Sequence, residues 1–171
     1  MIPTSLSLHN IYISDGHQFF GRHGLGADPH PIREVEEVEC VAHHGLRGDR
    51  FFGSPKYPLG QVTLFSREVL AAMRRELGIG ADPSALRRNL VVSGADLNML
   101  IGGEFELQTV VLRGVEECRP CYWMDRALGP GAEQWLRGRG GLRCQVLTSG
   151  WLRAERQLIA PAGFETVQVA G

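Results

Sequence analysis

The sequence predicts a mainly β fold with a few helices, arranged as a barrel or a strongly curved sheet. Several short segments show alternating apolar residues and are separated by glycine-rich turns. One segment alone has a clear helical period, and the regular strand–helix alternation of a parallel α/β sheet is missing. A chain of 171 residues with 43% hydrophobic residues can bury one substantial core. We therefore expect a single domain over residues 1–171.

The first half of the chain predicts four strands, because branched and apolar residues alternate there. A glycine- and proline-rich stretch with three histidines follows the first strand, and we expect it to form a surface loop that could cover a site. The N-terminal strand and this loop occupy residues 1–33, and the remaining motifs occupy about residues 34–160. The four predicted strands are residues 6–13, 35–42, 61–65 and 89–93.

One helix is well marked in the sequence, since Ser66 can cap its start and Gly78 can end it. The apolar residues between these two positions fall on one helical face. Asp82 followed by Pro83 predicts a second, shorter turn that ends at Arg87. Later elements are a long, bending strand at 104–115, helical turns at 122–128 and 132–136, and strands at 142–148, 151–159 and 164–169.

The charge argues against a nucleic-acid partner, and the lack of a long apolar run argues against a membrane span. The formal net charge is -1 and 22% of the residues are charged, so no basic field favours nucleic acid. No apolar run approaches the roughly 18 residues that span a bilayer, and the N-terminus lacks a secretory pattern. We therefore expect a cytoplasmic protein.

The basic residues are almost all arginine, since Lys56 is the only lysine among 18 basic residues. Arginine can bind a phosphate or a carboxylate through two N–H groups at once.

Four cysteines are too few for a disulfide scaffold in a chain of this length. Cys40 and Cys144 lie within alternating strands, and we expect both to pack in the core. Cys118 and Cys121 differ, because Pro120 prevents the strand from continuing and leaves a thiol in a loop at its end. An adjacent guanidinium, that of Arg119, favours the thiolate, which is both a nucleophile and a soft metal ligand.

Two familiar interpretations of the Cys118–Cys121 spacing fit the sequence poorly. A thioredoxin-like redox pair expects a βαβ context, whereas a long β-rich segment comes before this one. A zinc site needs two more ligands, and no second pair of closely spaced cysteines or histidines completes it. A functional thiol at a strand end is the interpretation that we favour over these two.

The segment Gly-Leu-Arg-Gly-Asp-Arg at 45–50 has the composition of an anion cradle. Glycine lets backbone amides approach an oxyanion, and Arg47 and Arg50 supply charge and paired N–H donors. Asp49 can hold one of these arginines in position. Such a turn suits a phosphate group.

Five ordered motifs together resemble the MOSC family, the domain found at the C-terminus of molybdenum cofactor sulfurases and as stand-alone bacterial proteins. Two departures from the family pattern are Phe51, where the family often has histidine, and Glu155-Arg156, which replaces a glycine–aspartate turn. The resemblance covers most of the chain. Its motifs are GLRGDR at 45–50, QVTL at 61–64 with Ser66, RNLVV at 88–92 with Gly94, Pro120-Cys121, and GGLR at 140–143.

The resemblance implies a MOSC-type β-barrel, similar to the β-barrel domain of pyruvate kinase, with a pocket for molybdenum cofactor (molybdopterin) or a sulfur-carrying intermediate. It implies that Cys121 is the catalytic thiol and the metal ligand, or carries sulfur as a persulfide. The pterin edge needs both donor and acceptor groups, which Asn89 offers. The residues expected to bind the cofactor are Arg47, Asp49, Arg50, Arg88, Asn89 and Arg119.

Several functions remain open from the sequence. Under the resemblance, the protein carries cofactor or activated sulfur from a donor protein, or reduces N-hydroxylated compounds at a bound molybdenum. A reductase would need a separate electron-transfer partner, because no flavin, nicotinamide or iron–sulfur motif occurs in the chain. The alternatives are a metal-independent thiol–disulfide protein that uses Cys118 and Cys121, and a binding module without chemistry.

Overall fold

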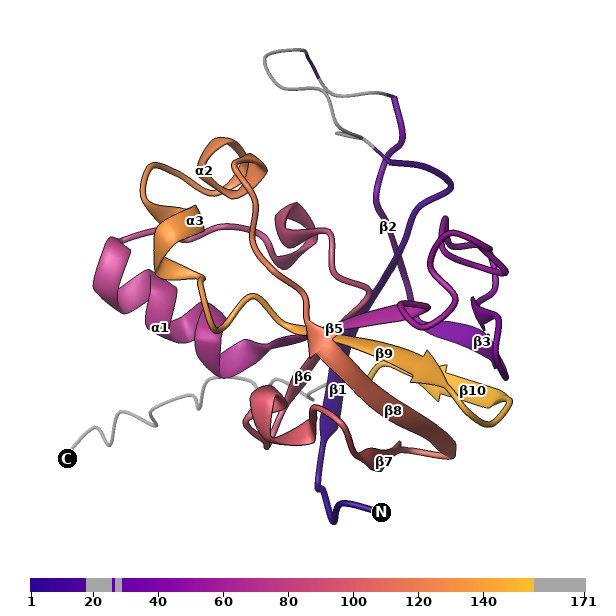
Figure 1. The fold of residues 1–171 in the computed structure, drawn as a ribbon. Coiled ribbons are helices and arrows are strands. Elements are labelled where there is room, and N and C mark those ends of the chain that lie inside the picture. The colour runs from indigo at the N-terminus through magenta and orange to yellow at the C-terminus, as the bar shows by residue number, and fades with distance from the viewer. Residues whose placement is uncertain (18–25, 27–28, 156–171) are drawn as a thin grey trace, which may run out of the picture.

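A strongly curled, seven-stranded sheet forms the centre of the computed structural model, which describes residues 1–17, 26 and 29–155 (Figure 1). The strands lie in the order β2-β1-β6-β5-β9-β8-β7, and all neighbours are antiparallel except β5 and β6. Their bounds are β1 Ser7–Ile13, β2 Arg33–Val35, β5 Val62–Ser66, β6 Leu90–Ser93, β7 Glu104–Leu107, β8 Val110–Glu117 and β9 Leu142–Val146.

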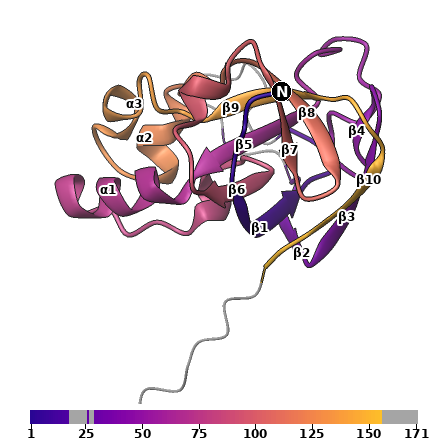
Figure 2. The ribbon, with the colours of Figure 1, turned by 90° about the horizontal axis from the view of Figure 1, so that it is seen from below.

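A second, three-stranded sheet and the curled sheet together form a barrel-like structure. The second sheet consists of β3 (Glu37–Val41), β4 (Gly45–Leu46) and β10 (Gly150–Arg153), in the order β10-β3-β4. Seen from below, the strands of both sheets surround a common interior (Figure 2). Gln61 joins them, since its side-chain amide donates to the His43 carbonyl at 2.6 Å and accepts from the Val146 N–H at 3.0 Å. The predicted mainly β fold with a curved sheet is confirmed.

The core lies between these two sheets. Inward-facing residues of β9 show how the sequence pattern builds it, because Leu142, Cys144 and Val146 are buried while the residues between them are partly exposed. Cys40 on β3 is fully buried in the same cluster. The expectation that Cys40 and Cys144 pack in the core is therefore confirmed.

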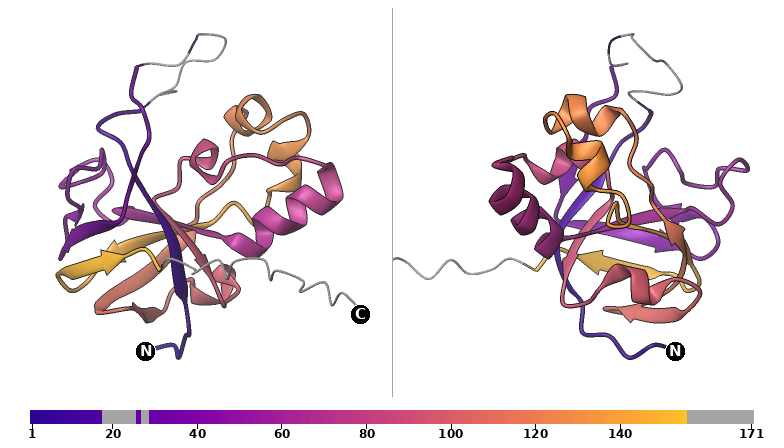
Figure 3. Two further views of the ribbon diagram at one scale, coloured as in Figure 1. Left: turned by 180° about the vertical axis from the view of Figure 1, so that it is seen from behind. Right: turned by 60° about the vertical axis from the view of Figure 1, so that its left-hand side comes forward.

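Helices gather beside one end of the curled sheet (Figure 3). Helix α1 (Arg67–Leu77) begins and ends as predicted, since the Ser66 hydroxyl accepts from the Val69 N–H and Gly78 adopts a left-handed backbone. Two short helices, α2 (Trp123–Ala127) and α3 (Ala132–Trp135), lie nearby. A second apolar cluster joins these helices to the sheet; its buried members are Phe65, Leu86, Met124, Ala132 and Leu136.

Two short 3₁₀ helices complete the described elements, η1 (Pro83–Leu86) and η2 (Leu97–Leu100). The first is the turn predicted from Asp82 and Pro83, and it ends at Arg87, whose φ is 55°. In the part of the chain that the structure describes, no helix is long and apolar enough to cross a membrane.

The sequence prediction was wrong about two strands. Residues 104–115 form the hairpin of β7 and β8 instead of one bent strand, because Gln108 takes a left-handed backbone with φ 53° and reverses the chain. Residues 35–42 are divided between β2, which pairs with β1, and β3, which joins the other sheet. The first part of the strand expected at 151–159 forms β10. The rest of that strand from residue 156, the strand expected at 164–169 and most of the loop expected at 16–31 lie outside the described residues.

Asn89 links three strands of the curled sheet. Its side-chain oxygen accepts from the Thr63 N–H at 3.0 Å and from the Thr63 hydroxyl at 2.9 Å. Its amide nitrogen donates to the Tyr12 carbonyl at 3.1 Å, and the residue is buried. These bonds tie β5 and β1 to the start of β6.

We expect Asn89→Ala to lower the free energy of unfolding by about 2–4 kcal/mol, because it leaves a buried N–H and a buried carbonyl without partners. Urea unfolding measures this loss, and the melting temperature should fall by roughly 5–15 °C. Asn98 provides a matched control, since it is exposed and its amide donates to the Gly138 carbonyl. Equal losses in Asn89→Ala and Asn98→Ala would contradict this role of Asn89.

Candidate functional site

The candidate site begins where β8 ends and the chain crosses to α2. The Cys118 N–H still donates to the Gly141 carbonyl at 2.8 Å, so the strand pairing extends one residue beyond β8. Pro120 has no N–H and ends this pairing. As a result, Cys118 is buried while Cys121 is exposed, and the Cys121 carbonyl accepts from the Met124 N–H at the start of α2.

Arg88 holds this crossing segment in place through its side chain. Its buried guanidinium donates to three main-chain carbonyls: Nη2 to Cys118 at 2.9 Å, Nε to Gly140 at 3.0 Å and Nη1 to Leu86 at 3.1 Å. One side chain therefore joins the end of η1, the cysteine segment and the turn before β9. Its bonds fix the segment on which Cys121 stands.

Asp49 and Arg50 form a second buried unit beside the end of β1. The Asp49 carboxylate accepts from the Ser14 N–H and the Phe51 N–H, each at 3.1 Å, and from Arg50 Nη1 at 3.2 Å. Arg50 Nη2 donates to the Arg87 carbonyl at 3.1 Å, and the guanidinium lies 4.6 Å from the centre of the Phe51 ring. Asp49 thus orients Arg50, as the sequence analysis expected.

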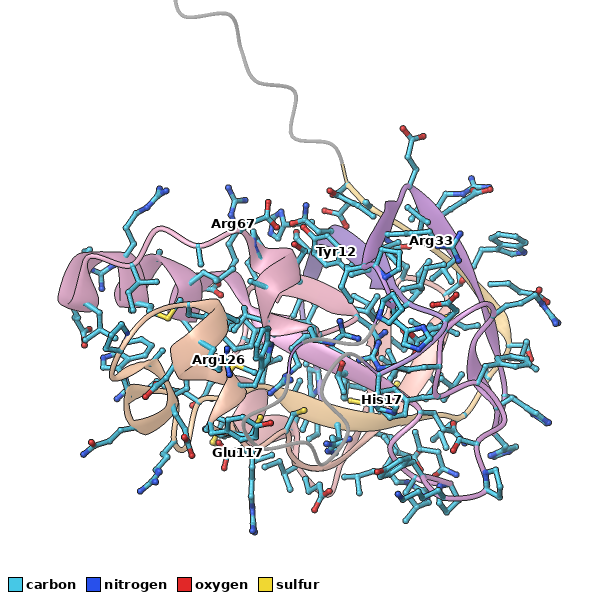
Figure 4. The ribbon with its side chains drawn as sticks, turned by 90° about the horizontal axis from the view of Figure 1, so that it is seen from above. Tyr12, His17, Arg33, Arg67, Glu117 and Arg126 are labelled. Carbon is cyan, nitrogen blue, oxygen red and sulfur yellow. The ribbon has the colours of Figure 1, made fainter. Side chains whose placement is uncertain are left out.

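Positive charge gathers around His17, which packs edge-on against Phe51 with the ring centres 5.2 Å apart. Partial burial, and after it four nearby cations, together lower the pKa of His17 to about 4. In Figure 4, which looks at the molecule from above, His17 and Glu117 lie on one side of the molecule, whereas Tyr12, Arg33 and Arg67 lie on the other. The four cations are Arg50, Arg87, Lys56 and Arg143.

Two of these cations lie beside a carboxylate: Arg50 Nη1 is 3.2 Å from Asp49, and Arg143 Nε is 3.6 Å from Glu116. Burial and the neighbouring Arg50 lower the pKa of Arg87 to about 10, and Asp49 opposes this effect. Burial also lowers the pKa of Arg50. Among the described residues, Arg50 Nε and Arg87 Nη1 are buried N–H groups without a hydrogen-bond partner. Each is a charged donor of the kind that binds an anionic oxygen.

The cysteine segment adjoins this charge. The Cys118 sulfur lies within electrostatic range of Arg50, and Arg88, which holds the segment, lies within range of the same guanidinium. The exposed Cys121 therefore stands on the same segment as Cys118, which lies near the buried cations. The arrangement can bind a ligand that carries both a soft, thiol-binding centre and an anionic group.

The structure places the other residues expected at the site differently. Asn89 uses both ends of its amide inside the sheet. Arg47 is exposed, forms an ion pair with Glu39 and lies 5.2 Å from the Phe52 ring centre. Arg119 is exposed on the cysteine segment. Asp49, Arg50 and Arg88 are the members of the expected set that meet as buried groups beside that segment.

Sequence reasoning did not assign His17, Arg87 or Arg143 to the site. Arg87 precedes the arginine–asparagine motif, and Arg143 ends the motif at 140–143, so both positions carried a signal. His17 stood in a histidine-rich stretch with no period, and nothing in that stretch singled it out. These residues come from three separate parts of the chain and meet through the fold.

A groove with a volume of about 560 Å³ lies elsewhere, between β1 and α1. Its lining includes His9, Arg67 and Arg74 but no cysteine. A smaller groove of about 450 Å³ lies at the start of α1 and also contains no thiol. Neither of these two grooves is lined by the cysteine segment. In the described ranges 1–17, 26 and 29–155, no group of three or more histidine, cysteine or acidic residues could hold a metal ion.

We expect one thiol of the native protein to react quickly with a chromogenic disulfide reagent, because Cys121 is exposed and the other three cysteines are buried. Cys121→Ser should remove this fast reaction, whereas Cys118→Ser should retain it. Unfolding in urea should release all four thiols of the wild type. Fast reaction of two thiols in the native wild type would show that Cys118 is not protected by the core.

Wild-type stability should decline as the pH falls from about 6.5 toward about 4, the window set by His17. The folded-state pKa of His17 is below its unfolded value, so the unfolded chain binds more protons in this window and gains relative stability. Urea unfolding at several pH values should show a smaller decline for His17→Asn than for the wild type. His44 is exposed and provides the control, so His44→Asn should follow the wild type. A decline equal in wild type and His17→Asn would contradict this contribution.

Comparison with solved structures shows the same fold in bacterial proteins of low sequence identity. YuaD from Bacillus subtilis aligns with a TM-score of 0.68 at 19% identity, covering 90% of this chain and 94% of that one. YiiM from Geobacillus stearothermophilus aligns with a TM-score of 0.61 at 12% identity, covering 88% of this chain and 72% of that one. YiiM from Escherichia coli aligns with a TM-score of 0.55 at 18% identity, covering 85% and 66% respectively.

A search of curated protein sequences gives no significant match. The family model of the MOSC domain, however, matches residues 49–158, which include Asp49 and Arg50, the Arg88–Asn89 motif and the cysteine segment. This span is more than half of the 171-residue chain. The chain therefore belongs to the MOSC domain family.

Proposed function

We propose that this protein binds molybdenum cofactor or an activated-sulfur intermediate, with Cys121 as the thiolate ligand or persulfide carrier. One observation carries the proposal: an exposed thiol stands on a segment that buried Arg88 fixes beside unpaired, buried arginine donors. Membership of the MOSC family supports it, because this family is generally linked to proteins of molybdenum cofactor chemistry.

The residues present fit both ends of such a cofactor. Molybdenum held by a dithiolene is a soft centre, and an exposed cysteine offers the soft thiolate that it prefers. The phosphate of the cofactor needs charged donors, and Arg50 Nε and Arg87 Nη1 are available for it. When bound, the cofactor would supply a redox-active metal centre. The chain itself would position the thiol through Arg88 and orient Arg50 through Asp49.

Sulfur carriage needs no chemistry beyond the thiol and a donor. The Cys121 thiolate would attack the outer sulfur of a persulfide on a donor protein. The donor's sulfur–sulfur bond breaks, a new one forms on Cys121 Sγ, and the donor leaves as a thiolate, so the step is balanced without an oxidant. Reduction of N-hydroxylated compounds would instead need electrons from a separate partner, since no motif for an electron carrier occurs in the chain. We therefore favour the carrier.

The burial of Cys118 favours Cys121 as the reacting thiol over a Cys118–Cys121 redox pair. The Cys118 thiol is shielded from solvent just beyond the end of β8, whereas Cys121 is exposed. Arg88 also binds the Cys118 carbonyl and holds that position. In this proposal Cys118 is a structural residue, and its replacement by serine is the matched control.

Protein from a host that makes molybdenum cofactor should contain molybdenum and pterin, or a persulfide detectable by mass spectrometry after exposure to a sulfur donor. Cys121→Ser should lower the bound metal, or the persulfide, at least about tenfold, because it removes the thiolate. Cys118→Ser should retain both. The proposal fails if wild-type protein contains neither pterin nor persulfide, or if Cys118→Ser loses them while Cys121→Ser keeps them.

A further inference from the structure

We propose that the groove between β1 and α1 is a second binding site, which takes a small molecule with one carboxylate and an apolar body. Its volume of about 560 Å³ lies within the range of small-molecule pockets, roughly 300–1,000 Å³. Figure 4 shows Arg67, which lines this groove, on the side of the molecule away from Glu117, which directly precedes the cysteine segment. The proposal therefore goes beyond the proposed function and does not rest on it.

Four parts of the chain line the groove. They are α1, the middle of β1, a residue of β6, and residues 79–83, which lead from α1 into η1. Apolar side chains from three of these parts are joined by a few polar and charged groups, as in most ligand pockets. These apolar side chains would contact the body of the ligand. They are Leu70, Ala71, Ile79, Ala81, Pro83 and Val91.

The charge of the lining favours a ligand with a single negative charge. Arg67 and Arg74 both line the groove, and they are seven residues apart, close to two turns of α1, so they share one helical face. Glu155 is the acidic residue among the described residues of the lining. Two arginines and one glutamate leave one positive charge in excess. A carboxylate complements this charge, and an apolar body complements the surface between the arginines.

Arg74 is the residue that we expect to bind the carboxylate. Its guanidinium lies against Gly80, since a β-carbon built on Gly80 would come 3.3 Å from Nη2 and 3.4 Å from Nε. The missing side chain of Gly80 thus leaves room for the guanidinium at the groove. In the described part of the chain, the Arg74 side chain makes no hydrogen bond or ion pair. Its donors are available to a carboxylate, which can accept two parallel N–H bonds.

Arg67, in contrast, is already held by β1. Its Nη1 lies 3.2 Å from His9 Nδ1, and His9 Nε2 lies 2.6 Å from Ser93 Oγ. A guanidinium can only donate, so Nδ1 accepts this bond and Nε2 carries the proton that the Ser93 hydroxyl accepts. The ring is therefore neutral in this arrangement, and burial followed by Arg67 lowers the pKa of His9. Arg67 supplies a fixed positive charge, and Arg74 supplies the open donors.

Octanoate is a suitable probe, because it combines one carboxylate with an unbranched apolar body. Isothermal titration of the full-length protein should show one binding site for octanoate. Octanamide has the same shape without the charge, and acetate has the charge without the body. Both should bind at least about tenfold more weakly than octanoate, because each lacks one half of the complementarity. The titration uses no metal, pterin or sulfur donor, so its result is independent of the proposed function.

Substitutions on α1 place the binding in this groove. Arg74→Gln should weaken octanoate binding about tenfold or more, since it removes charge-assisted bonds, and Arg74→Lys should lose less. Ala71→Glu should weaken binding by at least as much, because it adds a carboxylate at an exposed position in the lining. Arg75 is exposed on α1 and does not line the groove, so Arg75→Gln controls for the loss of one positive charge. Circular dichroism verifies that each variant is folded.

Three results would overturn the proposal: no octanoate binding by the wild type, equal binding of octanoate and octanamide, or equal weakening in Arg75→Gln and folded Arg74→Gln. The chain continues from Glu155, which lines the groove, into residues 156–171. If that segment were the occupant of the groove, the wild type would bind no octanoate, which is the first of these results.

Discussion

A single buried guanidinium joins the parts of this structure that would otherwise be independent. Arg88 stands two residues before β6 and donates to carbonyls at the end of η1, in the cysteine segment and in the turn before β9. Burial of a charge is expensive unless dipoles compensate for it, and three converging carbonyls provide that compensation. The hydrogen bonds of Arg88 therefore join η1, the turn before β9 and the cysteine segment.

The adjacent residues Arg88 and Asn89 stabilise different parts of the structure. Successive residues of extended chain point to opposite sides, so the two side chains leave the backbone in different directions. Asn89 binds Thr63 and Tyr12 within the sheet. Arg88 binds the cysteine segment and the turn before β9. The Arg88–Asn89 motif, which the sequence analysis expected to bind the cofactor, thus also stabilises the sheet and the cysteine segment.

The sequence was most informative where a local pattern decides the structure. Ser66 and Gly78 define α1 through capping, and Cys40 and Cys144 follow from strand alternation. The prediction was wrong at Gln108, where a polar residue reverses the chain without glycine or proline to mark the turn. The convergence of His17, Arg87 and Arg143 could not be predicted, since it depends on which strand ends meet after the sheet curls.

The unequal burial of the two closely spaced cysteines has a consequence for sulfur chemistry. A persulfide on a protein is often discharged by a resolving thiol of the same chain, which releases the outer sulfur as sulfide and leaves a disulfide. All four cysteines of this chain are described, and Cys121 is the exposed one. A sulfur atom held there has no neighbour at the surface to expel it. It would remain intact until an outside acceptor arrived, which is the behaviour of a storage or delivery form.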